Sequence, residues 1–168
     1  MMRQPPTGPG MWVLVSYRMP REPSSPRIAI WRKLKRLGVA QLSDGLVALP
    51  ADARTREHLD WIAEEIVESG GTVTVWLAQP ATRAQERELA GAMAAARSQE
   101  YRTVIDQAAA VSSAPQAERV RTVRRLRDEL RRIQRRDYFP PTERDTARQA
   151  VEFLGRARTQ ADSPEITL

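Results

Sequence analysis

The chain has 168 residues, no cysteine, one histidine and a formal net charge of +6. Without cysteine, disulfides and thiolate metal sites are excluded, and a single histidine excludes a histidine-rich metal cage. No apolar run approaches the roughly 20 residues of a transmembrane helix, and the first ten residues carry Pro and Gly where a signal peptide is apolar. We therefore expect a cytoplasmic protein with no membrane partner.

Residues 1–10 are predicted to be a disordered lead. The apolar run MWVLVSY over residues 11–17 predicts a buried strand. A helix is expected next, with Ser25 as its N-cap and Gly38 at its end. Its apolar side is predicted to hold Ile28, Trp31, Leu34 and Leu37, and its basic side includes Arg32, Lys33 and Arg36.

A hairpin follows, because Asp44-Gly45 is typical of a two-residue type I′ turn. Pairing outward from this turn places Leu42 opposite Val47 and Ala40 opposite Leu49, with all four on the core face. Asp52 is expected to cap a second helix that ends at Gly70-Gly71. Residues 72–77, TVTVWL, alternate as a strand does.

The order strand, helix, strand, strand, helix, strand is the βαββαβ pattern of the ferredoxin-like fold. The predicted class is therefore α+β, with an antiparallel sheet over residues 11–80 and two helices on one face. The second face must be covered or must bind something, because Trp12, Leu14, Leu46 and Trp76 are expected on it.

The remaining chain is predicted to be a helical subdomain of about three helices over residues 81–158, followed by a loose tail, residues 159–168. Thr82 and Gln85 form a capping box for a long helix that reaches about residue 110. Ser113 and Gln116 form a second box before the next helix. Two prolines, Pro140-Pro141, end that helix, and a last helix follows.

The segment over residues 118–136, called here the arginine helix, holds nine arginines. From Arg119 to Arg136 only Asp128 and Glu129 oppose them, which leaves +7 in a chain of +6 overall. The apolar residues repeat with helical spacing at Val120, Val123, Leu126, Leu130 and Ile133. The sequence thus predicts a helix with one packed side and a cationic surface.

Two stretches resemble a known family, the N-terminal domain of the ChrB chromate-resistance regulators. The first runs from Trp12 to Pro50 and includes Pro20, Arg27, Trp31, Arg32, Leu34, Gly38 and Asp44-Gly45. The second is the arginine helix running into Arg136-Asp137-Tyr138-Phe139-Pro140. The likeness covers about residues 12–154. The middle domain of the phenylacetate-pathway repressor, which is ferredoxin-like, is more distantly similar.

The resemblance implies a cytoplasmic, DNA-binding regulator linked to chromate response, in a form without the C-terminal domain of those regulators. From the residues, arginine suits backbone contact because its planar fork pairs with phosphate. The predicted nucleic-acid-binding residues are Arg121, Arg124, Arg125, Arg131, Arg132, Arg135 and Arg136, together with Arg32, Lys33 and Arg36.

Two alternatives stay open beside DNA binding. The cationic surface could be a solvated face whose charge is partly compensated by ion pairs such as Arg125–Glu129 and Asp128–Arg132. It could instead meet an acidic protein partner, or carboxylates of a second copy on the stripe Asp60, Glu64 and Glu68. A homodimer is expected whether the cationic surface binds DNA or protein. If it binds protein only, the protein would be a homo-oligomeric interaction module without DNA binding.

An enzyme is not expected. The first strand ends in Ser16-Tyr17-Arg18, without the carboxylate that a metal-dependent nuclease of this fold would place there. His58 has no nearby nucleophile, and no nucleotide-binding or hydrolase motif occurs. No catalytic residue, metal or cofactor is therefore predicted. A third alternative is an oxyanion sensor or enzyme in which arginines with Trp31 or Tyr101 cradle chromate.

Overall fold

The structure is a computed structural model that describes residues 10–160. Contacts divide the chain into two compact units, a sheet unit that ends at Met93 and a helical unit that begins at Ala94. The division lies within α3 (Arg83–Ala110), whereas the sequence predicts a boundary after residue 80. The predicted lead, apart from Gly10, and residues 161–168 of the predicted tail lie outside the described residues. Residues 159 and 160 are helical, contrary to the prediction.

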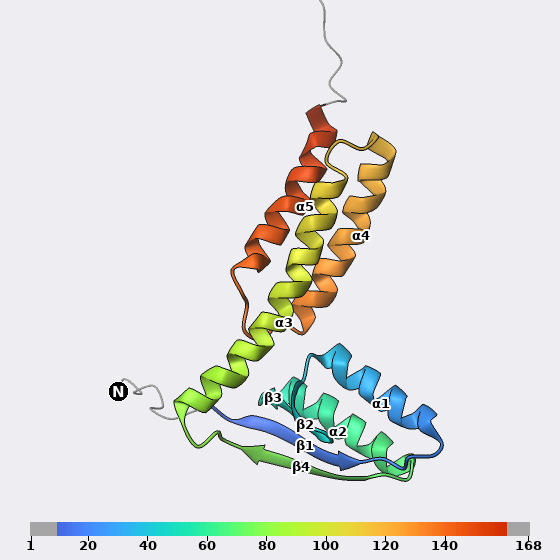
Figure 1. The fold of residues 1–168 in the computed structure, drawn as a ribbon, viewed down its shortest axis with the longest axis vertical. Helices are drawn as coiled ribbons and strands as arrows, with labels where there is room; N and C mark the ends of the chain where they lie inside the picture. Colours follow the sequence, from blue (N-terminus) through green and yellow to red (C-terminus); the bar gives the residue numbers. More distant parts are fainter. Residues whose placement is uncertain (1–9, 161–168) are drawn as a thin grey trace, which may run out of the picture. The chain divides into compact units, whose positions relative to one another are not determined.

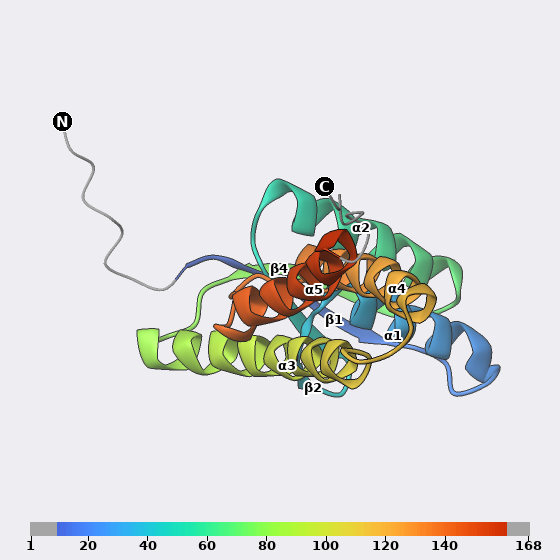
Figure 2. The same cartoon turned by 90° about the horizontal axis from the view of Figure 1, so that it is seen from above.

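The sheet unit follows the predicted order of elements: β1 (Trp12–Arg18), α1 (Ser24–Leu37), β2 (Ala40–Ser43), β3 (Leu46–Pro50), α2 (Ala53–Glu68) and β4 (Thr72–Ala78). All strand pairs are antiparallel, in the order β2-β3-β1-β4. Helices α1 and α2 lie side by side on the same side of the sheet (Figure 1, Figure 2). The predicted α+β class with an antiparallel sheet is therefore confirmed.

One face of the sheet packs under α1 and α2. Val13 pairs with Leu49 and Val15 with Val47, so these four share a face. All four are buried, as are Leu34 of α1 and the α2 residues Leu59, Ile62 and Ile66. Of the core face predicted for the hairpin, Ala40, Val47 and Leu49 are buried.

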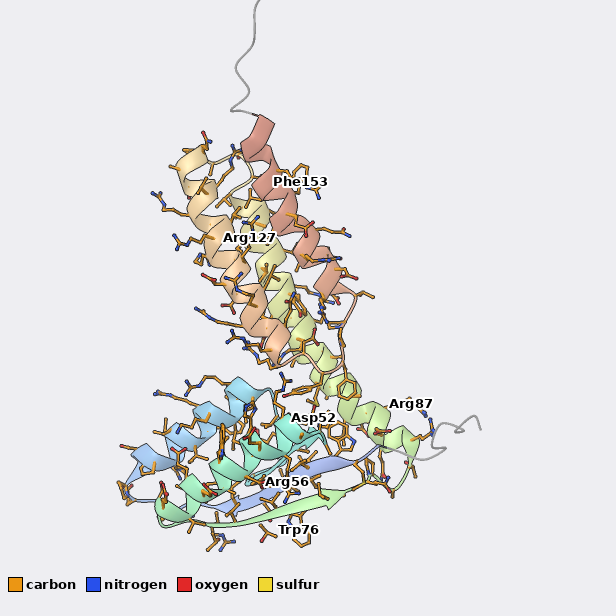
Figure 3. All side chains as sticks on the ribbon, turned by 180° about the vertical axis from the view of Figure 1, so that it is seen from behind. Asp52, Arg56, Trp76, Arg87, Arg127 and Phe153 are labelled. Atoms are coloured by element: carbon orange, nitrogen blue, oxygen red, sulfur yellow. The ribbon has the colours of Figure 1, made fainter. Side chains whose placement is uncertain are left out.

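The second face carries the apolar residues expected on it. Leu14 pairs with Ala48 on one side and with Trp76 on the other. Trp12 is only 2% exposed, and its indole Nε1 donates to Glu86 Oε1 of α3 at 3.1 Å. Trp76 is 53% exposed and projects from β4 (Figure 3), donating to Ser16 Oγ. The face is therefore covered at one end and open at Trp76.

Helix α1 differs from the prediction in its start and in its buried side. Pro23 occupies the N-cap, so Ser25 lies inside the helix and does not cap it. Ile30 and Leu34 are buried, whereas Ile28 is 44% exposed. The predicted stripe used steps of three, and each step of three falls about 60° short of a full turn. Ile28 therefore lies half a turn from Leu37.

The hairpin also differs. Ser43 pairs with Leu46, as the register next to the turn predicts, but a bulge follows. Ala40 then pairs with Ala48 and Gln41 with Val47, so the predicted register is wrong by one residue beyond the bulge. Leu42 is 38% exposed and does not join the core. Of the two turn residues only Gly45 has positive φ, at 72°, and a type I′ turn needs it at both. A Cβ at Gly45 would lie 2.4 Å from Tyr17 O, so only glycine fits there.

Of the other predicted N-caps, two are confirmed and one is wrong. Asp52 Oδ1 accepts from Thr55 N at 2.7 Å, and Thr55 Oγ1 accepts from Asp52 N, which forms a capping box. Thr82 and Gln85 bond reciprocally at the start of α3. The N-cap of α4 (Gln116–Arg135) is Pro115, which makes no side-chain cap, so the box predicted at Ser113 does not form.

The helical unit consists of α3 from Ala94, α4 and α5 (Glu143–Gln160). The three helices lie side by side in both views (Figure 1, Figure 2). Their shared core comprises Tyr101, Val104, Ala108, Val123, Leu126, Leu130, Ile133, Ala147, Val151 and Leu154. Among the described residues, the helices lack the length and apolar composition that crossing a bilayer requires.

Candidate nucleic-acid interface

Helix α4 contains the arginine helix, and its apolar side packs as predicted. Val123, Leu126, Leu130 and Ile133 are buried in the helical unit. Thr122 joins them, whereas Val120 is 37% exposed and lies beside the core rather than in it. With this side packed, some arginines of the arginine helix bond to residues of α3, and others line a groove beside α5.

On the α3 side, the arginines have acceptors. Arg125 Nη1 donates to Gln107 Oε1 at 2.7 Å, and Arg136 Nη2 donates to Glu100 Oε2 at 2.7 Å. Arg132 pairs with Glu129 on α4 itself, at 3.2 Å. The pairs predicted from spacing, Arg125–Glu129 and Asp128–Arg132, do not form, because Arg125 reaches α3 and the observed pairs within α4 join residues three apart.

On the α5 side, the arginines line a groove. Val120, Arg124, Arg127 and Arg131 are spaced by four, three and four, so they share one side of α4. The groove has a volume of about 390 Å³, and its lining comprises Gln116, Arg119, Val120, Val123, Arg124, Arg127 and Arg131 of α4 with Leu154 and Gly155 of α5. Arg127 lies near the middle of α4 (Figure 3).

The groove arginines are largely without counter-charge. Arg131 pairs with Asp128, but within residues 10–160 no ion pair involves Arg119, Arg124 or Arg127. Arg127 approaches the backbone of α5 closely, since a Cβ built on Gly155 would lie 3.2 Å from its Nη2. Several guanidinium groups therefore share a hollow without a carboxylate to neutralise them.

The structure places most of the predicted α4 residues on the surface. Those that are exposed are Arg121, Arg124, Arg125, Arg131, Arg132 and Arg135. Arg136 differs, because its side chain is 19% exposed and is bonded to Glu100. Sequence reasoning missed Arg119 and Arg127. Arg127 could have been found from its spacing of three from Arg124 and four from Arg131.

The basic residues of α1 form a separate set in the sheet unit. Arg32 and Arg36 are exposed. Lys33 is already paired, since its Nζ lies 2.6 Å from Glu65 Oε1 on α2. Of this set, Lys33 is therefore the least available for an external phosphate.

A buried polar cluster fixes the chain where α4 ends. The Asp137 side chain has no exposed surface, and its Oδ2 accepts from the Tyr101 hydroxyl at 2.7 Å. Burial, and then this hydrogen bond, raise the pKa of Tyr101 well above its ordinary value. Burial also lowers the pKa of the neighbouring Arg97. Tyr101 is thus committed to Asp137 and is not available to cradle an oxyanion.

The remaining candidates have ordinary structural surroundings. Asp60 pairs with Arg56 at 3.0 Å on the same face of α2 (Figure 3 labels Arg56). Within the described part of the chain, acidic residues and His58 do not gather into a metal-binding cluster. The His58 ring packs against Trp61 at 5.9 Å between centroids. Trp31 borders a shallow hollow with Arg18 and Arg27.

The chain is similar in sequence to known proteins of one family. The family model described as "Protein ChrB, N-terminal" matches residues 27–161. The curated Protein ChrB of Cupriavidus metallidurans (strain CH34) is 30% identical over 133 residues, which are 77% of this chain and 40% of that protein. The chain thus spans less than half the length of this relative. The arginine helix lies within the matched region. The chain belongs to the family of ChrB N-terminal domains.

Proposed function

We propose that this protein is a regulatory protein of chromate resistance that binds the phosphate backbone of duplex DNA through α4. The family supports the regulatory role, because the chain belongs to the ChrB N-terminal domains and its resemblance to the ChrB regulators implies a link to chromate resistance. The observation that carries the DNA contact is the uncompensated charge of α4. Six of its arginines, Arg119, Arg121, Arg124, Arg125, Arg127 and Arg135, make no ion pair within residues 10–160.

Backbone contact is the mode of binding that this surface supports. Arginine offers a planar fork that pairs with phosphate oxygens in a bidentate manner, and each neutralised phosphate releases counterions into solution. Nothing in α4 resembles a compact reading head that would present side chains to base edges. On this proposal the protein is a binding module without catalytic activity, active in the cytoplasm.

The ferredoxin-like fold is part of the proposal. The element order βαββαβ, the antiparallel strand order β2-β3-β1-β4 and the two helices on one face support it. In this architecture the sheet unit is a scaffold, and the charge of the interface belongs to the helical unit.

A gel-shift series with random duplex across increasing salt tests the function. The test variant reverses four exposed arginines of α4: Arg124, Arg125, Arg131 and Arg132, each to Glu. The matched control makes the same charge change at exposed positions of the sheet unit: Arg18, Arg27, Arg54 and Arg87. We expect the parent and the control to bind duplex at low salt and the test variant to lose binding. Equal binding by test and control variants would refute the proposed interface.

The expected homodimer and an acidic protein partner stay predictions beside this function. Light scattering of the same variants with and without salt separates them from DNA binding. If the parent does not bind duplex but forms a salt-sensitive dimer, and the α4 variant loses this dimer, the positive charge of α4 serves protein contact instead. Calorimetry with chromate addresses the oxyanion alternative, which predicts heat of binding in the absence of DNA.

A further inference from the structure

The groove between α4 and α5 differs from the rest of the cationic surface. Arg121 and Arg135 are exposed and without an ion-pair partner among the described residues, but they do not line it. Arg119, Arg124 and Arg127 also lack such partners and converge on a single hollow. Like charges held near one another repel, so an anion bound in the hollow relieves this repulsion. Convergence therefore distinguishes a binding site from a merely charged face.

The lining of the groove matches a phosphate that carries an attached carbon skeleton. Its volume of about 390 Å³ falls in the range of ~300–1,000 Å³ typical of small-ligand sites. Beside the guanidinium groups, Val120, Val123 and Leu154 provide an apolar surface. Apolar walls exclude water and strengthen the attraction between a guanidinium and an anion. A bare phosphate uses only the arginines, whereas a sugar phosphate uses both surfaces.

Glycine at position 155 keeps the α5 side of the groove open. A Cβ there would meet Arg127 Nη2 at 3.2 Å and Val123 Cγ1 at 3.8 Å. A larger side chain at this position would therefore occupy the space next to the Arg127 guanidinium. This offers a way to close the groove without removing any positive charge.

We propose, resting on the function proposed above, that the α4–α5 groove is the binding site for one phosphate ester. Arg124 and Arg127 bind the phosphate oxygens, and the attached sugar packs against Val120. The same chemistry is presented by a nucleotide of the DNA backbone and by a free phosphate monoester. The remaining exposed arginines of α4 attract the anion electrostatically from a distance and do not contact it directly.

The test first compares two pairs of substitutions that remove the same charge at different places on α4. The groove pair is Arg124→Gln with Arg127→Gln, and the control pair is Arg121→Gln with Arg135→Gln. Gly155→Leu fills the groove and retains every arginine. Val120→Glu places a carboxylate at a partly exposed position of the same groove, and it replaces the Gly155 variant if circular dichroism shows that Gly155→Leu misfolds.

Two ligands are titrated: a random duplex, followed by fluorescence anisotropy, and thymidine 5′-monophosphate, followed by calorimetry. We expect the groove pair and the filled groove each to weaken duplex binding at least tenfold near 0.1 M salt, and the control pair to weaken it less than about threefold. The monophosphate binds the parent and the control pair but not the groove variants.

The two proposals fail in different ways. If the groove variants still bind duplex and the control pair binds it more weakly, α4 binds DNA but the groove is not the phosphate-binding site. If the parent ignores duplex but binds the monophosphate through the groove, the DNA function fails and the groove stands as a site for a free phosphate ester. If neither ligand binds, both proposals are overturned.

Discussion

At the scale of single residues, Gly91 is an exposed glycine in the interior of α3, and its replacement tests the local physics of the helix. A Cβ at Gly91 would meet nothing within 4 Å. Gly91→Ala therefore removes backbone freedom from the unfolded chain without a clash, and we expect a gain of about 0.5–1 kcal/mol in the free energy of unfolding. Urea denaturation measures it. Gly45→Ala is the matched opposite, since its Cβ would meet Tyr17 O, and it should destabilise.

Tyr101 and Asp137 provide a second test at this scale. Tyr101→Phe removes the hydroxyl that donates to the buried Asp137 carboxylate, whose Oδ1 already has no partner. Leaving a buried acceptor unsatisfied costs ~1–3 kcal/mol, so the free energy of unfolding should fall by about that amount. Tyr17→Phe is the control, because Tyr17 is half-buried and outside this cluster. Equal losses in both variants would contradict the role given to the hydroxyl.

At the scale of elements, Glu143 ties the start of α5 to α3. Its Oε1 accepts from Arg102 Nη2 at 2.8 Å, and this bond, followed by bonds from its own backbone and from Ser98, lowers its pKa from 4.5 to about 2. Because the folded pKa is depressed, the stabilisation is fully present above pH 4.5 and disappears as pH falls toward about 2.

We therefore expect the difference in unfolding free energy between the parent and Glu143→Gln to be largest above pH 4.5 and to vanish near pH 2. Chemical denaturation at a series of pH values measures it. Arg102→Gln should reproduce the same loss of pH dependence, since it removes the main cause of the shift. A difference that is constant with pH would show that the ion pair does not hold this helix start.

The elements also show what the sequence could and could not predict. The caps at Asp52 and Thr82 are predictable because donor and acceptor lie within one turn, whereas the box predicted at Ser113 does not form because Pro115 occupies the N-cap of α4. The start of α1 and the bulge at Leu42 were missed, since packing against other elements decides them. The sequence shows where the arginines of α4 stand along the helix. It does not show which of them bond to α3 and which line the groove, because that depends on Gln107 and Gly155 of neighbouring helices.

At the scale of the whole molecule, the DNA contact proposed for α4 predicts a definite response to salt. Six arginines of α4 lack an ion pair within the described residues. Because Arg124 and Arg127 share one phosphate in the proposed groove, the six arginines neutralise at most five phosphates, and log K should fall with log salt with a slope of about −4.5. Replacing Arg124 and Arg127 by Gln should make the slope shallower by about 0.9. Anisotropy titrations measure both slopes, and a slope near zero would contradict phosphate contact.

The tryptophans of this protein are unevenly placed along the chain. All four (Trp12, Trp31, Trp61 and Trp76) precede Met93, and the helical unit has none. Indole emission excited near the red edge of the absorption band therefore reports on the sheet unit alone, whereas the ellipticity of the backbone reports on both. Melting curves recorded by the two signals will coincide if the units unfold together and separate if the arginine-bearing bundle melts at its own temperature.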